Sequence, residues 1–428
     1  MAWDFSTEPE FEKKLEWMRG FVREEIFPLE TVDLSPDQYA RITAPLKEQV
    51  KEQGLWAAHL PPELGGGGFG QVKLGLMHEI LGQSRFAPGI FGNQAPDSGN
   101  AELLAIGGSP EQKEQWMLPL LRGELRSCFS MTEPGAGADP TLLTTRAVLE
   151  GDEYVINGHK WFSSNASRAD FLIVMAVTDP DVSAYQGSSM IIVPVDTPGV
   201  NILRDIPVMD HSSVTPQLEG GHAEILYQDV RVPRANLVGN PGDGFKLAQQ
   251  RLGPGRIHHA MRWLGQSKRA FDMLCERAVS RYAHGSVLSE KQMIQDWVAT
   301  SAVEMQAARL LTLQAAWTMD QVGASNARNE IAIIKFWGAK ILHDVIDRAI
   351  QIHGSLGFSG DLPLEQMYRS ARAARIYDGP DEVHKATVAK RILRGYEATD
   401  VPTEHVPTRA AAAQRKFAQY LELATAND

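Results

Sequence analysis

The residues best suited to chemistry stand near the end of the chain, in the segment Tyr377–His384. Within it, Asp378 comes directly before a Gly-Pro pair, which is typical of a turn. Arg369, Arg372 and Arg375 precede this carboxylate. An acid group beside cations can serve as a general base next to a bound anion, or it can be an ordinary turn residue. The local sequence leaves both interpretations open.

The composition limits which classes of protein the chain can belong to. With 428 residues it is long enough for two or three packed units. Its 42 basic and 53 acidic residues give a formal charge of -11. Because binding to nucleic acid or anionic membrane needs a basic surface, we expect neither partner. An anionic ligand must therefore be held by a local group of positive side chains.

The two cysteines, Cys128 and Cys275, form no C-x-x-C pair, so no metal or redox site is predicted and a reducing compartment is favoured. The amino terminus passes into the charged stretch from Glu8 to Lys14 without the features of a secretory or transit peptide. No window approaches the ~20 apolar residues of a membrane span. We therefore expect a cytoplasmic protein.

Hydrophobic spacing divides the chain into four parts. Residues 1–126 have a helical period, residues 127–240 have short β-branched and aromatic runs, and residues 241–400 return to a long helical period. Residues 401–428 combine a proline-containing linker with a short helical tail. The pattern predicts a helical domain, a compact β-barrel or sandwich, and a helical bundle. Asn157-Gly158 is expected to form a tight hairpin turn.

Two further segments could hold a flat or phosphorylated ligand. Ser130–Asp139 offers hydroxyls and backbone amides on a glycine turn, and Asn157–Asn165 offers aromatic rings and hydroxyls at the end of a strand. Taken alone, the first segment could also be a plain loop, and the rings of the second could also be aromatic residues of the core. The glycine run at Gly65–Gly70 satisfies G-x-G-x-x-G, but it follows prolines rather than a buried strand, which favours a surface turn over a dinucleotide fold.

The order of these segments, from about residue 10 to 397, resembles the flavin-dependent acyl-CoA dehydrogenase family. Gln351–Phe358 and Val230–Pro233 are supporting matches, and Ala95–Asn100 with Gly253–His259 is similar to a divergent branch that carries Asp in place of the usual catalytic Glu. The resemblance implies an α+β multidomain subunit that binds FAD, with an N-terminal helical domain, a middle β-barrel domain and a C-terminal four-helix bundle. It also implies a homotetramer built as a dimer of dimers, or a homodimer, with electron-transfer flavoprotein as electron acceptor in fatty acid β-oxidation.

The resemblance also assigns site residues. Asp378 would be the base that removes the α-proton of an acyl-CoA while the β-hydrogen leaves as hydride to flavin N5, giving trans-2-enoyl-CoA. Residues that would contact FAD are Phe129, Met131, Thr132, Gly137, Ala138, Phe162, Ser164, Arg281, Gln351, Gly354 and Pro380, of which Arg281 and Gln351 would reach the flavin of a neighbouring subunit. Residues that would contact the substrate are Arg256, Ala138, Asp97, Asn100, Tyr377 and Gly379, with Arg256 holding the CoA portion unless it forms only a surface salt bridge.

Some positions depart from the family pattern. Members of the family place the base at one of two positions. Gly255 occupies the second position here, which leaves Asp378 as the candidate base. Pro380 and Glu382 replace residues that commonly touch FAD, which weakens the expected contacts of that loop. Asp97 and Asn100 are more polar than a straight alkyl chain prefers, so a hydroxylated or branched acyl group is expected, unless these residues are helix caps or face solvent.

Two rival functions share the same fold. One is a flavin oxidase, including a nitroalkane-oxidase type that uses an Asp base without CoA. The other is a catalytically silent flavin-binding scaffold, because a fold alone does not specify a function.

Overall fold

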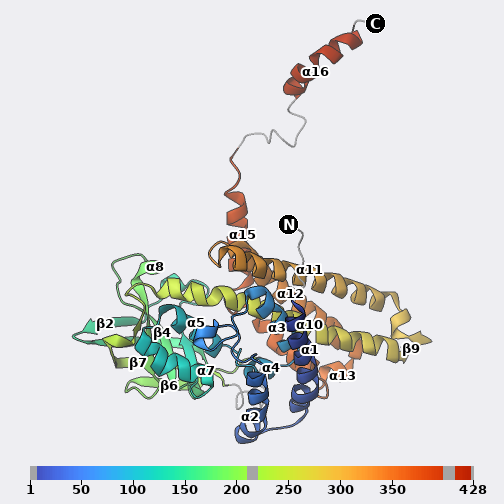
Figure 1. Ribbon diagram of the computed structural model, residues 1–428. Helices are drawn as coiled ribbons and strands as arrows, with labels where there is room; N and C mark the ends of the chain where they lie inside the picture. The colour runs from blue at the N-terminus through green and yellow to red at the C-terminus, as the bar shows by residue number, and fades with distance from the viewer. Residues whose placement is uncertain (1–6, 210–219, 399–409, 426–428) are drawn as a thin grey trace. The chain divides into compact units, whose positions relative to one another are not determined.

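The computed structural model describes residues 7–209, 220–398 and 410–425. The chain divides into two compact units, residues 1–385 and residues 386–428. The larger unit holds every element from α1 to α14 and the first residues of α15 (Figure 1). The predicted order of helical, β and helical parts is confirmed.

Short helices make up the amino-terminal part. They are α1 (Pro9–Phe21), α2 (Pro36–Glu52), α3 (Gln71–Leu81), α4 (Ala87–Ile90), α5 (Asp97–Gly107), α6 (Pro110–Gln112) and α7 (Leu118–Arg122). Helix α2 begins with a capping box in which Ser35 and Gln38 each bond the other's backbone. The glycine run at 65–70 is a turn that leads into α3, as predicted, and no strand precedes it.

The middle part is a mixed eight-stranded sheet. Its strands are β1 (Ser127–Ser130), β2 (Arg146–Glu150), β3 (Glu153–Ser164), β4 (Phe171–Val177), β5 (Ser188–Pro194), β6 (Val200–Asp205), β7 (His222–Pro233) and β8 (Leu237–Val238), with the short helix α8 (Ala184–Gly187) before β5. The order is β6-β7-β3-β2-β4-β5-β8, and β1 pairs with β4 in parallel. Strands β4 and β5 are buried almost throughout, as expected for apolar runs covered on both faces.

The hairpin predicted at Asn157-Gly158 is wrong, because β3 continues through this pair. The turn between β2 and β3 falls instead after Glu150, and the pairing of β3 with β7 shifts between Ile156 and Gly158. Asn157 exchanges hydrogen bonds of 2.9 and 3.0 Å with Asp229, and a Cβ on Gly158 would lie 2.3 Å from Oγ1 of Thr145. The pair therefore forms a β-bulge with a close backbone approach.

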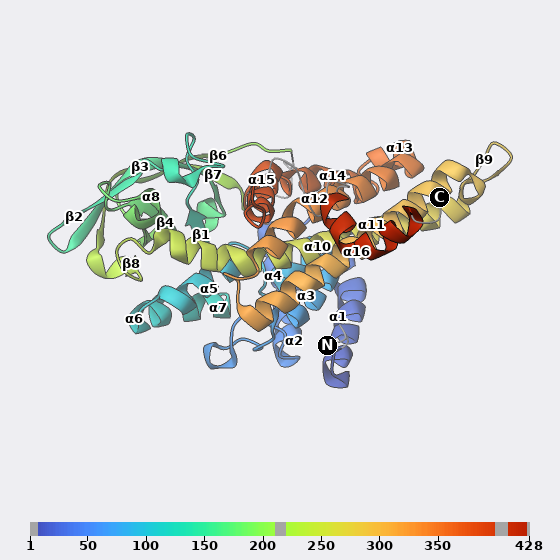
Figure 2. The same ribbon diagram turned by 90° about the horizontal axis from the view of Figure 1, so that it is seen from above.

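Long helices dominate the carboxy-terminal part of the larger unit. They are α10 (Gly244–Ser280), α11 (Gln292–Val322), α12 (Arg328–His353), α13 (Ser355–Phe358), α14 (Leu364–Ala373) and α15 (Asp381–Leu393), with a hairpin of β9 (Tyr282–Ala283) and β10 (Ser286–Val287) between the first two. Helix α10 runs through Pro254 without ending. In Figures 1 and 2, the sheet and β9 lie at opposite ends of the larger unit.

One hydrophobic core joins the first and last helical parts. Phe11 of α1, Leu74 of α3, Ile257 of α10 and Ile341 of α12 all belong to it and are almost fully buried. A second core links α5, the sheet and the start of α10. Helix α10 therefore crosses the molecule in contact with every part that could carry a site residue.

The smaller unit contains the end of α15 and the helix α16 (Ala410–Thr425), which agrees with the predicted helical tail. The predicted linker at 401–408 lies outside the described residues. Among the helices that the structure describes, none has the length and apolar character needed to cross a membrane. The predicted domain boundaries at residues 126, 240 and 400 remain a prediction.

Candidate active site

Asp378 lies on the short loop between α14 and α15. Its backbone is left-handed, with φ of 54°, and Gly379 follows with φ of 97°. A Cβ on Gly379 would lie 2.8 Å from Nε2 of His384, so a side chain at this position cannot be accommodated without movement. A left-handed non-glycine residue costs about 1 to 3 kcal/mol and persists only where its surroundings hold it. The loop is therefore fixed by its contacts.

The contacts that hold the loop reach its backbone. Nε and Nη2 of Arg256 donate to the carbonyl oxygen of Asp378 at 3.1 and 3.0 Å, and Nε2 of His384 donates to the same oxygen at 3.1 Å. Nζ of the fully buried Lys335 donates to the carbonyl of Gly379 at 3.2 Å. These three donors fix the loop through its carbonyls and leave the Asp378 carboxylate to be placed by other groups.

The carboxylate of Asp378 faces a histidine. Its Oδ2 lies 3.5 Å from Nε2 of His259, and the aspartate side chain is 22% exposed. Burial alone would raise the pKa of Asp378, but the facing His259 and the positive side chains of Arg256, Arg251 and Lys335 together more than offset it and hold the pKa below its usual value. Asp378 is therefore ionised at neutral pH, as a general base must be before it acts.

Tyr377 packs beside the Asp378 loop. Its hydroxyl accepts a hydrogen bond of 2.9 Å from Nε1 of Trp263, and its ring centre lies 5.0 Å from that of His259. Burial raises the pKa of the Tyr377 hydroxyl. The phenol thus stays neutral and forms one wall beside the Asp378 loop.

The arginines before the loop do not gather around an anion site. Arg369 forms an ion pair with Glu365 at 2.7 Å within α14, and Nε of Arg375 donates to Asp381 at 2.7 Å. The charges of Arg369 and Arg375 are used in local ion pairs, so these two arginines give no support to the anion site that the sequence alone left open.

A second arginine lies deep between α5, β1 and α10. Arg251 is 9% exposed; its Nε donates to Oδ1 of Asn100 at 3.1 Å, and its guanidinium stacks on the ring of Phe129 at 4.1 Å. Among the described residues, no carboxylate forms an ion pair with it. A buried guanidinium bonded only to an amide and a ring is unusual and marks a site where a further hydrogen-bond acceptor would be stabilised.

The predicted substrate residues Asp97 and Asn100 are committed to protein contacts. Oδ1 of Asp97 accepts from the backbone N and the hydroxyl of Ser127, each at 2.7 Å, and Nδ2 of Asn100 donates to that hydroxyl at 2.8 Å. Neither residue caps α5 with its side chain, and Asn100 is fully buried, so the solvent-facing and capping alternatives do not describe them. Asn100 instead orients Arg251.

The loop after β1 is fixed by a buried ion pair. Nζ of Lys160 donates to Oε1 of Glu133 at 2.9 Å and to the carbonyl of Met131 at 2.6 Å, and both charged side chains are almost fully buried. Burial opposes ionisation of Glu133, but Lys160 and two threonine hydrogen bonds lower its pKa to about 2. The pair holds Met131 and Thr132 against β3, where the backbone N of Trp161 donates to the Thr132 carbonyl at 3.0 Å.

Phe162 and Ser164 lie on the same stretch of β3. Phe162 has φ of 48° and its side chain is 43% exposed, because the pairing with β7 shifts between Lys160 and Ser163. The Ser164 hydroxyl lies 2.7 Å from Nδ1 of His222. The irregularity therefore turns an aromatic ring toward the outside of the sheet beside a partly buried hydroxyl.

Three family models match successive parts of the chain: the acyl-CoA dehydrogenase N-terminal domain over residues 8–124, the middle domain over 128–218 and the C-terminal domain over 242–393. The chain belongs to the acyl-CoA dehydrogenase family. It is therefore an oxidoreductase enzyme with FAD as its cofactor, and it acts on acyl-CoA.

Several members of this family are similar over long stretches. The chain is 43% identical to "Probable acyl-CoA dehydrogenase FadE2" of Mycobacterium tuberculosis, covering 89% of this chain and 95% of that protein. It is also 43% identical to "Acyl-CoA dehydrogenase family member 11" of Rattus norvegicus over 82% of this chain, but this spans only 44% of that longer protein. The solved glutaryl-coenzyme A dehydrogenase glutaryl-CoA complex has a TM-score of 0.81 and 27% identity, with coverage of 94% and 100%.

The face formed by β1, β3 and the loop between them fits the cofactor of the acyl-CoA dehydrogenases. Met131 and Thr132 are half-buried there, the Phe162 ring is exposed, and a Cβ at Gly135 or Gly137 would meet no atom within 4 Å. Exposed backbone on a glycine turn beside an aromatic ring suits a flat group with a pyrophosphate. Met131, Thr132, Phe162 and Ser164 are the residues that would hold FAD.

The structure separates the remaining predicted cofactor residues. Gly137 and Ala138 are exposed on the loop after β1, and Pro380 is half-buried next to Asp378. Arg281 and Gln351 are exposed near β9 and at the end of α12, and Gly354 follows with φ of 65°. In Figure 2, β9 and α13 lie far from β1 and β3, the strands that carry Phe129, Phe162 and Ser164.

Four residues of the site were not predicted from the sequence: Arg251, His259, Lys160 and Lys335. A helical projection could have found His259, because it lies three positions after Arg256 on the same face of α10. The buried lysines carry no sequence signal, since isolated lysines are almost always at the surface.

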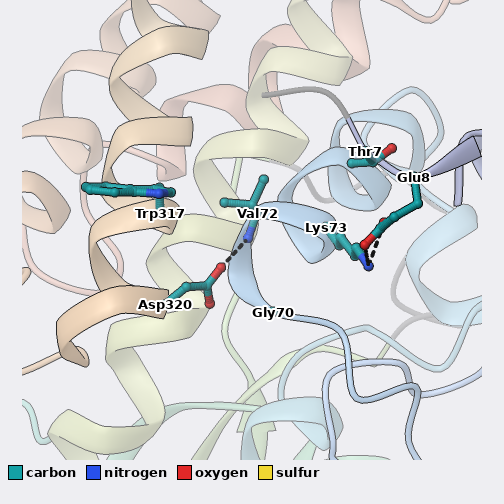
Figure 3. Close-up of a pocket in the computed structure, with 7 residues that line it drawn as sticks. All are labelled: Thr7, Glu8, Gly70, Val72, Lys73, Trp317 and Asp320. Carbon is teal, nitrogen blue, oxygen red and sulfur yellow. Dashed lines mark hydrogen bonds and ion pairs between the residues drawn. The ribbon is translucent and has the colours of Figure 1, made fainter. Parts of the chain in front are cut away.

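A separate hollow lies between the chain start, α3 and α11. Thr7, Glu8, Gly70, Val72, Lys73, Trp317 and Asp320 line it (Figure 3). The Asp320 carboxylate accepts from the backbone N of Gln71 at 2.7 Å and of Val72 at 3.1 Å, and Lys73 forms an ion pair with Glu8 at 2.9 Å. These charged groups satisfy one another and the start of α3, so the hollow has a structural explanation. None of the predicted site residues lies there.

Proposed function

We propose that Asp378 is the base of this acyl-CoA dehydrogenase and removes the α-proton of the bound thioester. The observation that carries the proposal is the ionised Asp378 carboxylate on a loop held by Arg256, His384 and Lys335. Gly255, at the alternative position for a base, has no side chain that could replace it.

In this reaction the α C–H bond breaks and its proton passes to Asp378, while a double bond forms between the α and β carbons. Bound FAD supplies the acceptor for the β-hydrogen, which leaves as hydride. The acyl chain excludes water when it binds, which raises the pKa of Asp378 from its low value toward the operating pH. The product is a trans-2-enoyl-CoA.

Arg251 supports the proposal that the acyl group carries a polar substituent. Its guanidinium is buried, Asn100 fixes it from one side, and Phe129 covers one of its faces. A plain alkyl chain would offer this charge no acceptor beyond Asn100, whereas a hydroxyl oxygen could accept from it. We therefore favour a hydroxylated acyl-CoA over a straight-chain or a purely branched one.

We further propose a homo-oligomer, tetrameric or dimeric, in which Arg281 and Gln351 reach the FAD of a neighbouring subunit. Both side chains are exposed, and β9, next to Arg281, lies far from β1 and β3, which agrees with this role (Figure 2). Arg256 is proposed to assist in holding CoA in addition to its bonds to the Asp378 carbonyl. Electron-transfer flavoprotein is the proposed electron acceptor.

The test is anaerobic reduction of the purified flavoprotein by a panel of straight-chain, hydroxylated and branched acyl-CoA thioesters. We expect at least one thioester to reduce the parent enzyme, and Asp378→Asn to lose about a thousandfold or more in rate. An Asp378→Asn variant that is reduced as fast as the parent would disprove the assignment of the base.

The same experiment separates the rival functions. Slow reoxidation of the reduced flavin in air and fast reoxidation by electron-transfer flavoprotein are expected for a dehydrogenase. Rapid peroxide formation would favour an oxidase, and a yellow protein that no thioester reduces would favour a silent scaffold.

Arg251→Met tests the substituent. The variant is expected to lose at least about tenfold in kcat/KM for the best hydroxylated thioester, the equivalent of one charge-assisted hydrogen bond, and little for the matching straight-chain thioester. Equal losses for both thioesters, or better turnover of the straight-chain thioester by the parent enzyme, would contradict the proposed substrate.

A further inference from the structure

Helix α10 presents three side chains toward Asp378 at a spacing of three residues. Arg256, His259 and Arg262 therefore share one face of the helix. Arg256 donates to the backbone carbonyl of Asp378, and His259 faces its carboxylate. Arg262 contacts the opposite edge of the His259 ring, so Arg262 and His259 form a continuous path to the carboxylate, while Arg256 holds the backbone of the loop.

Arg262 determines which ring nitrogen of His259 carries the proton. Its Nη2 lies 3.1 Å from Nδ1 of His259, and its Nη1 donates to the carbonyl of Asn93 at 3.0 Å. A guanidinium can only donate, so Nδ1 of His259 must accept. A neutral imidazole has one N–H, which is then on Nε2, the nitrogen 3.5 Å from Oδ2 of Asp378.

The surroundings keep this imidazole neutral. Burial and the charge of Arg262 lower the pKa of His259 to about 3. The charged and titratable groups that act on Asp378 are Arg251, Arg256, His259 and Arg262 of α10, Lys335 of α12, the neighbouring Tyr377, and His384 of α15. His259 cannot relay the substrate proton. Its Nδ1 already accepts a hydrogen bond from Arg262, so no second nitrogen is free to exchange a proton while Nε2 takes one up.

We propose that His259, fixed as its Nε2–H tautomer by Arg262, is a positioning residue that orients the carboxylate of Asp378. The inference rests on the proposed role of Asp378 as the base. His259 directs its Nε2 toward Oδ2 at 3.5 Å, while Oδ1, which forms no hydrogen bond or ion pair with the described residues, is left to receive the α-proton. The proton stays on Asp378 in this step, and His259 keeps the proton that it had.

This arrangement suits an aspartate. Its side chain has one rotatable bond fewer than that of glutamate, and it reaches less far from a loop that is already fixed. A donor on one carboxylate oxygen defines the rotation of the group, which proton transfer requires to within about 0.5 Å.

The kinetic test compares His259→Leu with His259→Gln, whose amide can still donate, in the FAD-loaded enzyme. Flavin reduction is followed anaerobically with octanoyl-CoA, or with whichever thioester of the panel reduces the parent fastest. We expect His259→Leu to lower the limiting rate by at least about tenfold, with KM changed less than about threefold, and His259→Gln to recover most of the rate. An unchanged rate in His259→Leu would overturn the proposal.

Arg262→Leu provides the matched control, because it leaves His259 in place but frees Nδ1. It should also slow flavin reduction, and the double variant Arg262→Leu/His259→Leu should be no slower than the slower single variant, since both act through one contact. Losses that multiply in the double variant would show that Arg262 does not act through His259.

Nitrogen-15 NMR of the parent protein tests the tautomer without any turnover, with His259→Gln used to assign the signal. A protonated Nε2 and an unprotonated Nδ1 are expected; the reverse pattern, or protonation of both, overturns the proposal even if a variant fails to fold. If Asp378→Asn abolishes flavin reduction but His259→Leu does not, the positioning role fails while Asp378 keeps its role as the base. If Asp378→Asn has no effect, the proposed function fails instead.

Discussion

The buried pair of Lys160 and Glu133 offers a test of how the loop after β1, which we propose faces FAD, is held. In Lys160→Met the cation is removed, while the length of the side chain is largely kept. The lysine side chain is 0% exposed and the glutamate 3% exposed. Glu133 would keep its hydrogen bonds from the backbone and hydroxyl of Thr144 and from the backbone of Thr145, but it would have no counter-ion.

The expected magnitude follows from this burial. Breaking a buried ion pair by removing one partner costs about 3 to 5 kcal/mol, because the remaining charge is left uncompensated. The lost bond from Nζ to the Met131 carbonyl adds to this cost. With total stabilities of about 5 to 15 kcal/mol, the variant should be strongly destabilised. Its loop at 131–133 should also retain less FAD.

Urea denaturation and the FAD content per subunit measure the two effects. Lys13→Met is the matched control, since its ion pair with Glu10 is exposed by 74% and 84% and should change stability by less than about 1 kcal/mol. The double variant Lys160→Met/Glu133→Gln removes the stranded charge and should recover much of the loss. A loss below about 1 kcal/mol in Lys160→Met, or a double variant less stable than the single one, would refute the reasoning.

Two further predictions concern the loop and pH. Gly379→Ala should lower the rate of flavin reduction by more than about tenfold, because the φ of 97° and the 2.8 Å approach to His384 would force the Asp378 loop to move. Gly360→Ala is the control: its Cβ meets no atom within 4 Å, so the rate in the same assay should be nearly unchanged. The free energy of unfolding should be highest above pH 6.5 and should fall toward pH 4, by up to about 1.4 kcal/mol per pH unit for each of His59 and His259. Burial lowers the pKa values of these two residues to about 4 and about 3, so the unfolded chain binds their protons first as the pH falls. Urea denaturation at about pH 7 and about pH 5 checks this, and equal stabilities would contradict it.

The fold was largely predictable because its parts differ in hydrophobic period. The apolar runs at 171–174 and 190–193 lie in β4 and β5, and the stripes that begin at Ile294 and Ile334 lie in α11 and α12. Asn157-Gly158 misled because a pair that permits a tight turn also permits a bulge. Only the contacts with Thr145 and Asp229, far away in sequence, decide between them.

Site residues that belong to a short sequence motif could be predicted, whereas charged residues that matter because they are buried could not. Asp378 and Gly379 could be singled out because a Gly-Pro turn and an acid group are visible in one short segment. Arg251 and Lys160 could not, since nothing near them in the sequence indicates that a charge lies in the interior. Their importance depends on partners such as Asn100 and Glu133, which tertiary packing brings close.

The anchoring of the Asp378 loop through backbone carbonyls has a consequence for how this enzyme could have diverged from its relatives. Arg256, His384 and Lys335 would hold the loop in the same place whatever side chain followed Tyr377. The support of the loop backbone is thus independent of the side chain at this position, whereas the proposed contact with His259 suits the aspartate. A mutation at position 378 could replace one acidic residue by another, and so change how far the carboxylate extends, without an intermediate sequence that fails to fold.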